Sequence, residues 1–202
     1  MYQLLETICI KNGFPCHLNY HQQRMDESII LLFGTKNHIN LQKELVIPEF
    51  TFQGLWKCRL IYQRQIESIS FEPYQKREIT SLKVIVNDKI DYSLKYYDRT
   101  SINQLSLQKG HCDDILIVKN NLIADTSYSN ICFFKDDKWF TPTTPLLNGT
   151  CRKRLLDEKI IIAKHIYVEE IFNYKYFMLI NAMLDFNTEV IQQINNQSLC
   201  FE

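Results

Sequence analysis

Four short segments between Lys95 and Arg152 contain residue types that could do covalent chemistry. They are KYYDR from Lys95, DTSYSN from Asp125, TP from Thr141 and GTCR ending at Arg152. A lysine attacks carbonyl groups when burial or neighbouring positive charge lowers the pKa of its amine, because only the neutral amine is a nucleophile. A glycine that precedes a helix lets backbone amides bind a phosphate. We therefore expect an amine nucleophile and a phosphate site in one chain.

Lys95 lies between Leu94 and Tyr96 on a strand that we expect over residues 92–97, outside any charged surface run. Such surroundings lower the pKa of a lysine amine by desolvation. The alternative is a partly exposed strand lysine whose aliphatic stem covers neighbouring tyrosines. The spacing around Lys95 alone favours that alternative, and the segments that follow it favour the nucleophile.

The order and spacing of the four segments closely resemble the fold type IV pyridoxal-phosphate enzymes, the family of branched-chain and D-amino acid aminotransferases and of 4-amino-4-deoxychorismate lyase. The resemblance covers roughly residues 4–186 and is firmest after Lys95. It implies an α+β fold like that of D-amino acid aminotransferase, with a small α/β N-terminal domain over residues 1–88 and a β-rich pseudo-barrel domain over residues 89–202. It also implies the cofactor pyridoxal 5'-phosphate and a homodimer with the active sites at its interface.

Within this resemblance, Lys95 matches the lysine that forms an aldimine with the cofactor and then acts as general base and acid. Asp125 stands where the family usually has a glutamate, which keeps the ring nitrogen protonated. Asn130 matches an asparagine that holds the loop behind the cofactor. Because aspartate is one methylene shorter, a second interpretation of Asp125 stays open, in which its carboxylate only stabilises a turn after Ala124.

The resemblance implies phosphate binding at the turn that begins at Gly149, where the amides of Thr150 and Cys151 would open a helix. The second element is Arg24, which resembles the arginine of a family His-x-x-Arg segment. Its planar guanidinium can fork onto two phosphate oxygens. Arg24 could equally be a solvated residue on the polar face of a helix.

Substrates of this family carry a carboxylate, so the resemblance implies an arginine that faces the cofactor from the smaller domain. Arg59 matches the strand arginine of the branched-chain enzymes, and Arg64 and Arg99 are weaker candidates. Asn181 and Ala182 resemble an Asn-Ala segment of the lyases on the phosphate side. Each arginine could also be an exposed charge, and the Asn-Ala pair could be a buried strand end.

Two reactions fit the resemblance. A lyase would eliminate pyruvate from 4-amino-4-deoxychorismate and release 4-aminobenzoate, whereas an aminotransferase of the branched-chain or D-amino acid type would release a keto acid. KYYDR from Lys95 and INA from Ile180 favour the lyase. A catalytically inactive descendant is a third possibility, because Asp125 replaces glutamate and relatives carry a strand and a glycine turn before the position of Leu5.

Composition narrows the classes of partner. The chain has 202 residues, of which 46% are hydrophobic, enough for a buried core in one or two domains. Its 23 basic residues balance 23 acidic ones, so net charge indicates neither nucleic acid nor an anionic membrane. The partner that the resemblance implies is a small amine or carboxylate substrate. Seven scattered cysteines without a CxxC pair favour reduced thiols and no metal site. With no basic leader and no apolar run of membrane-spanning length, we expect a cytoplasmic enzyme.

Hydrophobic periodicity predicts the elements that must position these residues. A strand over residues 2–10 should turn at Asn12 and Gly13, and a helix should follow from a cap at Asn19 to a stop at Gly34. The other expected strands cover residues 55–62, 67–71, 81–86, 115–118, 122–124, 130–134, 139–141, 160–168 and 176–184.

Two short helices complete the expected fold. In the first, Ile102, Leu105 and Leu107 should share a buried face after a cap at Thr100 or Ser101. The second should cover residues 150–156 and open the phosphate site. The sequence thus predicts an α+β first half and a β-rich second half.

Overall fold

The computed structural model describes residues 2–201, which divide into two compact units. The first unit comprises the chain up to Lys76 together with Leu94–Asp98, and the second comprises Arg77–Ser93 and the chain from Arg99 onward. The expected domain boundary between residues 88 and 89 stays a prediction. Strand β5 (Leu82–Val86) precedes that boundary but pairs in parallel with β6 (Asp114–Lys119) of the second unit.

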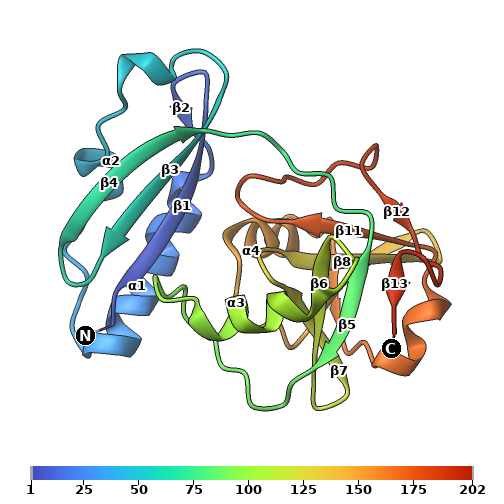
Figure 1. Ribbon diagram of the computed structural model, residues 1–202. Helices are drawn as coiled ribbons and strands as arrows, with labels where there is room; N and C mark the ends of the chain where they lie inside the picture. The colour runs from blue at the N-terminus through green and yellow to red at the C-terminus, as the bar shows by residue number, and fades with distance from the viewer. Residues whose placement is uncertain (1, 202) are drawn as a thin grey trace. The chain divides into compact units, whose positions relative to one another are not determined.

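An antiparallel sheet in the order β2-β1-β3-β4 forms the first unit (Figure 1). Its strands are β1 (Leu4–Lys11), β2 (Phe14–Pro15), β3 (Leu55–Tyr62) and β4 (Ile66–Pro73). The expected turn is confirmed, because Asn12 and Gly13 have φ values of 49° and 81° and join β1 to β2. Positive φ at both central residues is the geometry of a tight two-residue hairpin loop.

Helix α1 (Leu18–Phe33) packs one face against this sheet. The expected start is wrong: the residue before the helix is His17, which adopts a left-handed conformation with φ of 52° and whose side chain makes no capping bond. The expected stop is confirmed, because Gly34 ends α1 with φ of 65° and donates its amide to the Ile30 carbonyl. Two shorter elements follow, α2 (Leu41–Glu44) and the 3-10 helix η1 (Glu49–Thr51).

The second unit contains two sheets, in the orders β10-β9-β8-β11-β12 and β13-β5-β6-β7. The remaining strands are β7 (Leu122–Thr126), β8 (Asn130–Lys135), β9 (Lys138–Pro142), β10 (Ile162–Lys164), β11 (Tyr176–Ile180), β12 (Gln192–Gln193) and β13 (Leu199–Cys200). The four strands expected between residues 115 and 141 are confirmed as β6 to β9.

The two last expected strands are shorter in the structure. β10 gives way to the 3-10 helix η3 (Val168–Asn173), whose Ile171 is fully buried. β11 ends at Ile180 because the side chain of Asn181 accepts the amides of Met183 and Leu184 and turns the chain. The burial of Ile171 and the hydrogen bonds of the Asn181 turn, rather than strand propensity, therefore limit the lengths of β10 and β11.

Three helical segments complete the second unit: α3 (Thr100–Ser106), the 3-10 helix η2 (Leu107–Lys109) and α4 (Thr150–Asp157). Ile102 and Leu105 are buried, but Leu107 is 84% exposed, because it lies five positions after Ile102 and therefore off the helix face that they share. The residue before α3 is Arg99, whose side chain makes no capping bond, so the expected cap at Thr100 or Ser101 is also wrong.

The α+β fold class and the β-rich second half are confirmed. No helix among residues 2–201 combines the length and the apolar character needed to cross a bilayer.

Candidate functional site

Three polar residues cluster in the core of the first unit, and we call Glu6, His21 and Arg24 the Glu6 cluster. Successive side chains of a strand point to opposite faces, so Glu6 lies on the same face of β1 as Leu4 and Ile8, both fully buried. Its Oε2 lies 2.6 Å from His21 Nδ1 and accepts the Arg24 Nη2 at 2.5 Å, and its Oε1 accepts Arg24 Nε at 2.9 Å. A fully buried carboxylate is thus held by a forked arginine and a histidine.

The negative charge of Glu6 is balanced by the positive charge of Arg24, as a buried carboxylate requires. Burial alone would raise the pKa of Glu6, but the Arg24 guanidinium and the hydrogen bond from His21 outweigh it and lower the pKa to about 2. Burial lowers the pKa of His21, with Arg24 and Lys95 acting in the same direction against the opposing effect of Glu6. Glu6 is therefore ionised and His21 neutral at neutral pH.

Lys95 lies beside this cluster, since its charge contributes to the lowered pKa of His21. The segment Leu94–Asp98 runs along β1: Leu5 donates its amide to the Lys95 carbonyl at 2.9 Å, Tyr97 donates to the Gln3 carbonyl at 2.9 Å, and Tyr96 bridges Leu4. The expected strand over residues 92–97 is therefore wrong, because only this single bridge forms. Lys95 itself is half-buried.

The expected arginines occupy different surroundings. The fork of Arg24 holds Glu6, a partner that the sequence did not indicate, and its phosphate contact stays a prediction. Arg59 is half-buried in β3, on the face opposite to its buried neighbours Cys58 and Leu60. Arg64 lies over the ring of Phe33, 5.4 Å from its centroid.

Arg99 belongs to the second unit, where its guanidinium contacts the turn that contains Ser127 and Tyr128. Its Nη2 donates to the Ser127 carbonyl at 2.6 Å, and its guanidinium lies 4.0 Å from the centroid of the Tyr128 ring. Both partners lie between Asp125 and Asn130. These contacts assign Arg99 the stabilisation of this turn.

Asp125 and Asn130 bond directly to each other across that turn. Asn130 Nδ2 donates to Asp125 Oδ1 at 2.7 Å and to the Leu147 carbonyl at 2.9 Å, and the Leu147 amide donates to Asp125 Oδ2 at 2.9 Å. Asp125 is 5% exposed and lies within β7. Its carboxylate therefore links three segments and does more than stabilise its own turn.

Burial has a large effect on this carboxyl group. It raises the pKa of Asp125 to about 6, against the opposing effects of the Leu147 amide, the Asn130 side chain and the Arg152 guanidinium. Arg152 is itself buried, and its Nη2 donates to the Pro142 carbonyl at 2.7 Å. A positively charged partner would shift Asp125 further toward its ionised form.

Gly149 brings the start of α4 against Asn130. A Cβ atom on Gly149 would lie only 2.1 Å from Asn130 Oδ1, so no larger residue fits without moving Asn130. Thr150 and Cys151 open α4, and no side chain caps the helix. The amides of this first turn are therefore donors for an anion.

Asn181 and Ala182 lie in the turn after β11. Asn181 Nδ2 donates to Ser129 Oγ at 2.9 Å, directly before Asn130 in the sequence. Asn181 therefore holds the loop that carries Asn130. The structure thus brings Asp125, Asn130, Gly149 and Asn181 together by direct contacts within the second unit, while Lys95 and Arg24 belong to the first.

Residues 3–187 match the family model described as amino-transferase class IV. The chain belongs to the class IV aminotransferase family. This is a family of enzymes whose cofactor is pyridoxal 5'-phosphate.

Proteins that resemble this chain come from several bacteria. An uncharacterised protein of Haemophilus influenzae is 39% identical over 185 residues, which are 91% of this chain and 98% of that protein. A crystal structure from Haemophilus somnus, described as a "putative 4-amino-4-deoxychorismate lyase", is 37% identical with a TM-score of 0.87, and the match covers 92% of this chain and 98% of that one.

A hypothetical aminotransferase of Mycobacterium tuberculosis in a PLP-bound form shares the fold. It is 16% identical with a TM-score of 0.77, and the match covers 98% of this chain and 81% of that one. These likenesses confirm the fold type IV class that the sequence indicated.

Sequence reasoning missed Glu6 and His21 as members of a site. A signal was present: Glu6 interrupts the series of apolar residues at Leu4, Ile8 and Ile10 that form the core-facing side of β1. A charge at such a position is rarely buried without a partner. The spacing of His21 and Arg24 on one helix provides that partner.

Proposed function

We propose that this chain is a pyridoxal-phosphate enzyme that acts on an amino-group substrate through Lys95, and that its reaction is the elimination of pyruvate from 4-amino-4-deoxychorismate to give 4-aminobenzoate. One observation carries the proposal: Asp125, Asn130 and Gly149, which match the family in order, are joined by direct contacts in the second unit. The likeness to the Haemophilus somnus protein at 37% identity supports the lyase reaction.

The residues present fit the cofactor chemically. A phosphate dianion needs donors, and the first turn of α4 offers the amides of Thr150 and Cys151 without a capping side chain. A protonated ring nitrogen needs a carboxylate, and Asp125 is a buried one with its orientation fixed by Asn130 and Leu147. The aldehyde needs a primary amine, and Lys95 provides one in half-buried surroundings.

Bound pyridoxal phosphate supplies an electron-withdrawing ring that stabilises negative charge on the substrate carbon. In this proposal, Asp125 keeps the proton on the ring nitrogen and Asn130 fixes Asp125. The amides of α4 bind the phosphate. Lys95 takes a proton from the substrate carbon and returns one, and Arg59 binds the substrate carboxylate.

An aminotransferase reaction is the second candidate, since the family model bears that description. In that case Lys95 would return the proton to the cofactor side and the product would be a keto acid. Aspartate in place of glutamate at residue 125 also permits an inactive descendant, which would bind the cofactor without turnover.

The experiment combines trapping with product analysis. Purified protein is incubated with pyridoxal phosphate and treated with borohydride, and peptide mass spectrometry locates the added mass; we expect it on Lys95. A second sample receives 4-amino-4-deoxychorismate, and we expect stoichiometric pyruvate and 4-aminobenzoate. Release of keto acids from amino acids, with no pyruvate from 4-amino-4-deoxychorismate, would establish the aminotransferase instead.

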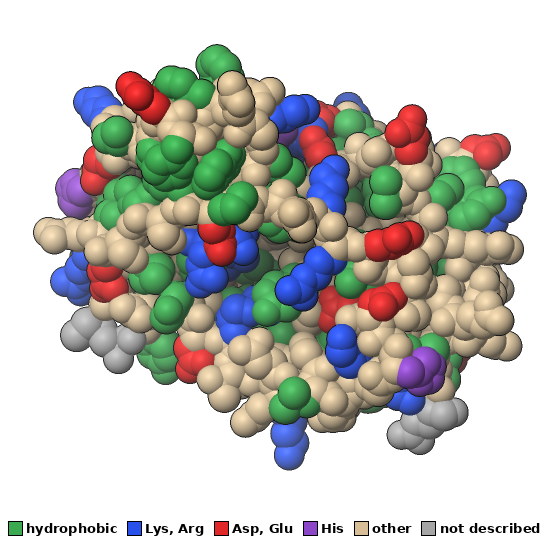
Figure 2. All heavy atoms as spheres, turned by 45° about the horizontal axis from the view of Figure 1, so that its top comes forward, with side chains coloured by type: hydrophobic (Ala, Val, Ile, Leu, Met, Phe, Trp, Pro, Cys, Tyr) green, Lys and Arg blue, Asp and Glu red, His purple; other side chains and the backbone are tan. Residues whose placement is uncertain are grey.

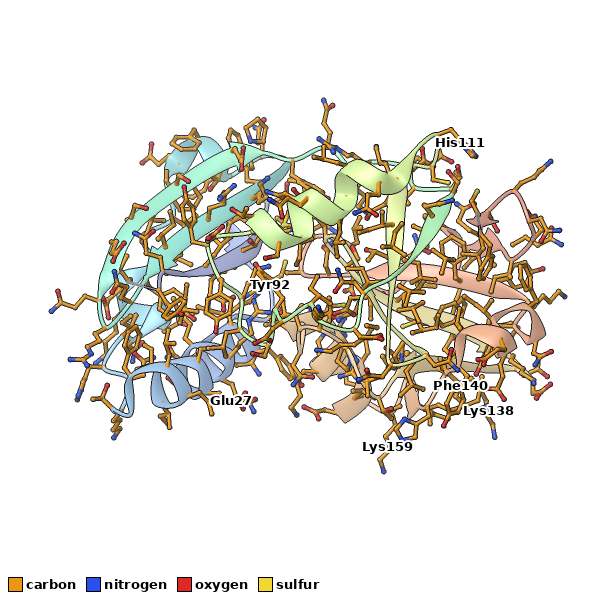
Figure 3. The ribbon with its side chains drawn as sticks, turned by 60° about the horizontal axis from the view of Figure 1, so that its bottom comes forward. Glu27, Tyr92, His111, Lys138, Phe140 and Lys159 are labelled. Atoms are coloured by element: carbon orange, nitrogen blue, oxygen red, sulfur yellow. The ribbon has the colours of Figure 1, made fainter. Side chains whose placement is uncertain are left out.

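Lys95→Ala should abolish both the trapped mass and the turnover. Lys138→Ala is a matched control, because Lys138 is an exposed lysine at the first position of β9 (Figure 3) and matches no motif of the family. Absence of any trapped mass in the wild type would overturn the proposal. A trapped mass on Lys95 without turnover of any amine would identify the inactive descendant.

We further propose a cytoplasmic homodimer. The described residues contain seven free cysteines, as expected where thiols stay reduced. Phe14, Val46, Phe50 and Phe52 are each more than half exposed, and Figure 2, which turns the β2 and η1 end of the first unit forward, shows hydrophobic side chains gathered there. Such a patch favours contact with protein. Sedimentation of wild type and of Phe14→Ser tests it, with a dimer expected only for the wild type.

A further inference from the structure

Three potential metal ligands meet in the second unit, outside the proposed cofactor site. They are His111, Cys112 and Cys200, whose ligand atoms all lie within 4.8 Å of one another. His111 and Cys112 lie between η2 and β6, and Cys200 lies on β13, 89 positions after His111. No metal-site spacing was visible in the sequence, because the fold, and not a local motif, brings Cys200 to His111 and Cys112.

The pairing of β13 fixes the position of Cys200. β13 pairs in parallel with β5, with Cys200 opposite Lys83, and Leu199 is buried beneath it. Leu82 at the start of β5 pairs in turn with Asp114 at the start of β6, two residues after Cys112. Backbone ladders on both sides thus hold the two thiols close together.

The distances suit a tetrahedral ion. Cys200 Sγ lies 3.7 Å from His111 Nε2. In a tetrahedral zinc site with metal–sulfur bonds of about 2.3 Å and metal–nitrogen bonds of about 2.0 Å, the sulfur and nitrogen ligands lie about 3.5 Å apart. The observed separation therefore needs only a small rotation of one side chain.

The surroundings allow an ion to enter and to keep an open position. His111 is exposed, while Cys112 is 2% exposed, and Figure 3 places His111 beyond the end of α3. The nearby Asp113 does not provide a fourth ligand from its Oδ2, because that oxygen already accepts bonds from the backbone and side chains of Thr80 and Ser81. Water would complete the coordination.

We propose that His111, Cys112 and Cys200 bind one zinc ion through one imidazole nitrogen and two thiolates. Both thiols lose their protons on binding, so one Zn²⁺ replaces two H⁺ and the site gains two metal–sulfur bonds. Soft thiolates with an imidazole select zinc over magnesium or calcium. The ion would tie the strand β13 to the segment that leads into β6 and so stabilise the second unit.

Cobalt substitution tests the proposal directly. The full chain, kept reduced with a phosphine and freed of metal, is titrated with Co²⁺ and then with Zn²⁺. We expect one Co²⁺ per chain with a near-ultraviolet thiolate-to-cobalt charge-transfer band and intense visible bands of tetrahedral coordination. Zinc should displace the cobalt and raise the thermal unfolding midpoint, and a chelator should reverse that rise.

Three variants separate the site from unspecific thiol binding. Changing the hydrogen bonds around a metal ligand costs about 10-fold to 100-fold in affinity, so loss of a ligand in Cys200→Ser or His111→Gln should cost at least tenfold. Cys16→Ser is the matched control, because Cys16 is also half-buried but lies in the first unit. His111→Gln changes an exposed side chain and should leave folding intact.

A wild type without charge-transfer bands would overturn the proposal. Equal cobalt affinity in Cys16→Ser and Cys200→Ser would overturn it as well. Circular dichroism checks that each variant is folded, and the His111 variant keeps the test decisive if Cys200→Ser unfolds.

Discussion

Glu6 provides the negative charge that balances Arg24 in the core of the first unit. It is fully buried and accepts three close contacts from Arg24 and His21. Glu6→Gln would leave the Arg24 guanidinium, whose side chain is 11% exposed, without a counter-charge. Breaking a buried pair from one side costs about 3–5 kcal/mol. We expect the free energy of unfolding in urea at pH 7 to fall by that amount.

Glu72→Gln is the matched control for this change. Glu72 also pairs with a cation, Lys57 at 2.8 Å, but its side chain is 49% exposed. Surface ion pairs contribute about 1 kcal/mol or less. A loss of similar size in both variants would contradict the role of Glu6.

Residue 149 must be a glycine because a side chain there would collide with Asn130, and not because of its backbone conformation. Its φ is −67°, which any residue can adopt, but a Cβ would meet Asn130 Oδ1 at 2.1 Å. Gly149→Ala should displace Asn130 from Asp125 and cost about 1–3 kcal/mol, the range for overpacking. Pyridoxal phosphate binding, followed by absorbance, should weaken with it.

The double variant Gly149→Ala with Asn130→Ala tests this cause. Removing the Asn130 amide makes room for the new methyl group, so the combined loss of stability should be smaller than the sum of the single losses. Additive losses in urea denaturation would show that the collision is elsewhere.

At the scale of elements, α1 carries both His21 and Arg24, and its end is set by Gly34. This residue has φ of 65° and open space where a Cβ would lie, so a larger residue there meets strain but no collision. The left-handed region costs non-glycine residues about 1–2 kcal/mol, with asparagine affected less. We expect Gly34→Ala to lower the thermal midpoint more than Gly34→Asn. The reverse order would indicate a lost contact instead.

Elements with regular patterns could be predicted from the sequence, and irregular ones could not. β1, β3 and α1 contain recurring apolar residues, α4 was expected from the turn at Gly149, and the ends of all four agree with expectation to within one or two residues. The segment of Lys95 failed as a strand because its pairing stops after one bridge to Leu4. No local pattern encodes how many partners an edge segment will find.

In the site, too, some residues could be predicted from local sequence and others could not. Asp125, Asn130 and Gly149 could be named from their spacing, and direct contacts now join them. The contact of Arg24 with Glu6 depends on which face of β1 meets α1, and the meeting of Cys112 with Cys200 depends on sheet order. Both are tertiary facts that a list of residues does not contain.

At the scale of the whole molecule, the two units carry buried carboxyl groups with opposite responses to pH. The pKa of Glu6 in the first unit is lowered to about 2, and that of Asp125 in the second is raised to about 6. The stability that Glu6 contributes is present above its unfolded pKa of 4.5 and is lost as the pH falls toward 2. The contribution of Asp125 is present below its unfolded pKa of 3.8 and is lost as the pH rises through 6.

Each unit contains one of the two tryptophans, Trp56 in β3 and Trp139 in β9, so fluorescence can follow them separately. In the Trp139→Phe background, Glu6→Gln should remove an acid-induced loss of about 3 kcal/mol in the free energy of unfolding between pH 4.5 and 2, since each pKa unit corresponds to about 1.4 kcal/mol.

In the Trp56→Phe background, Asp125→Asn should remove a loss of about 3 kcal/mol in the free energy of unfolding that occurs as the pH rises from 4 to 6. Comparing each variant with its parent cancels the effect of Asp113, whose pKa is lowered by hydrogen bonds from Thr80 and Ser81. Parallel pH profiles for parent and variant would show that these carboxyl groups do not control the stability of their units.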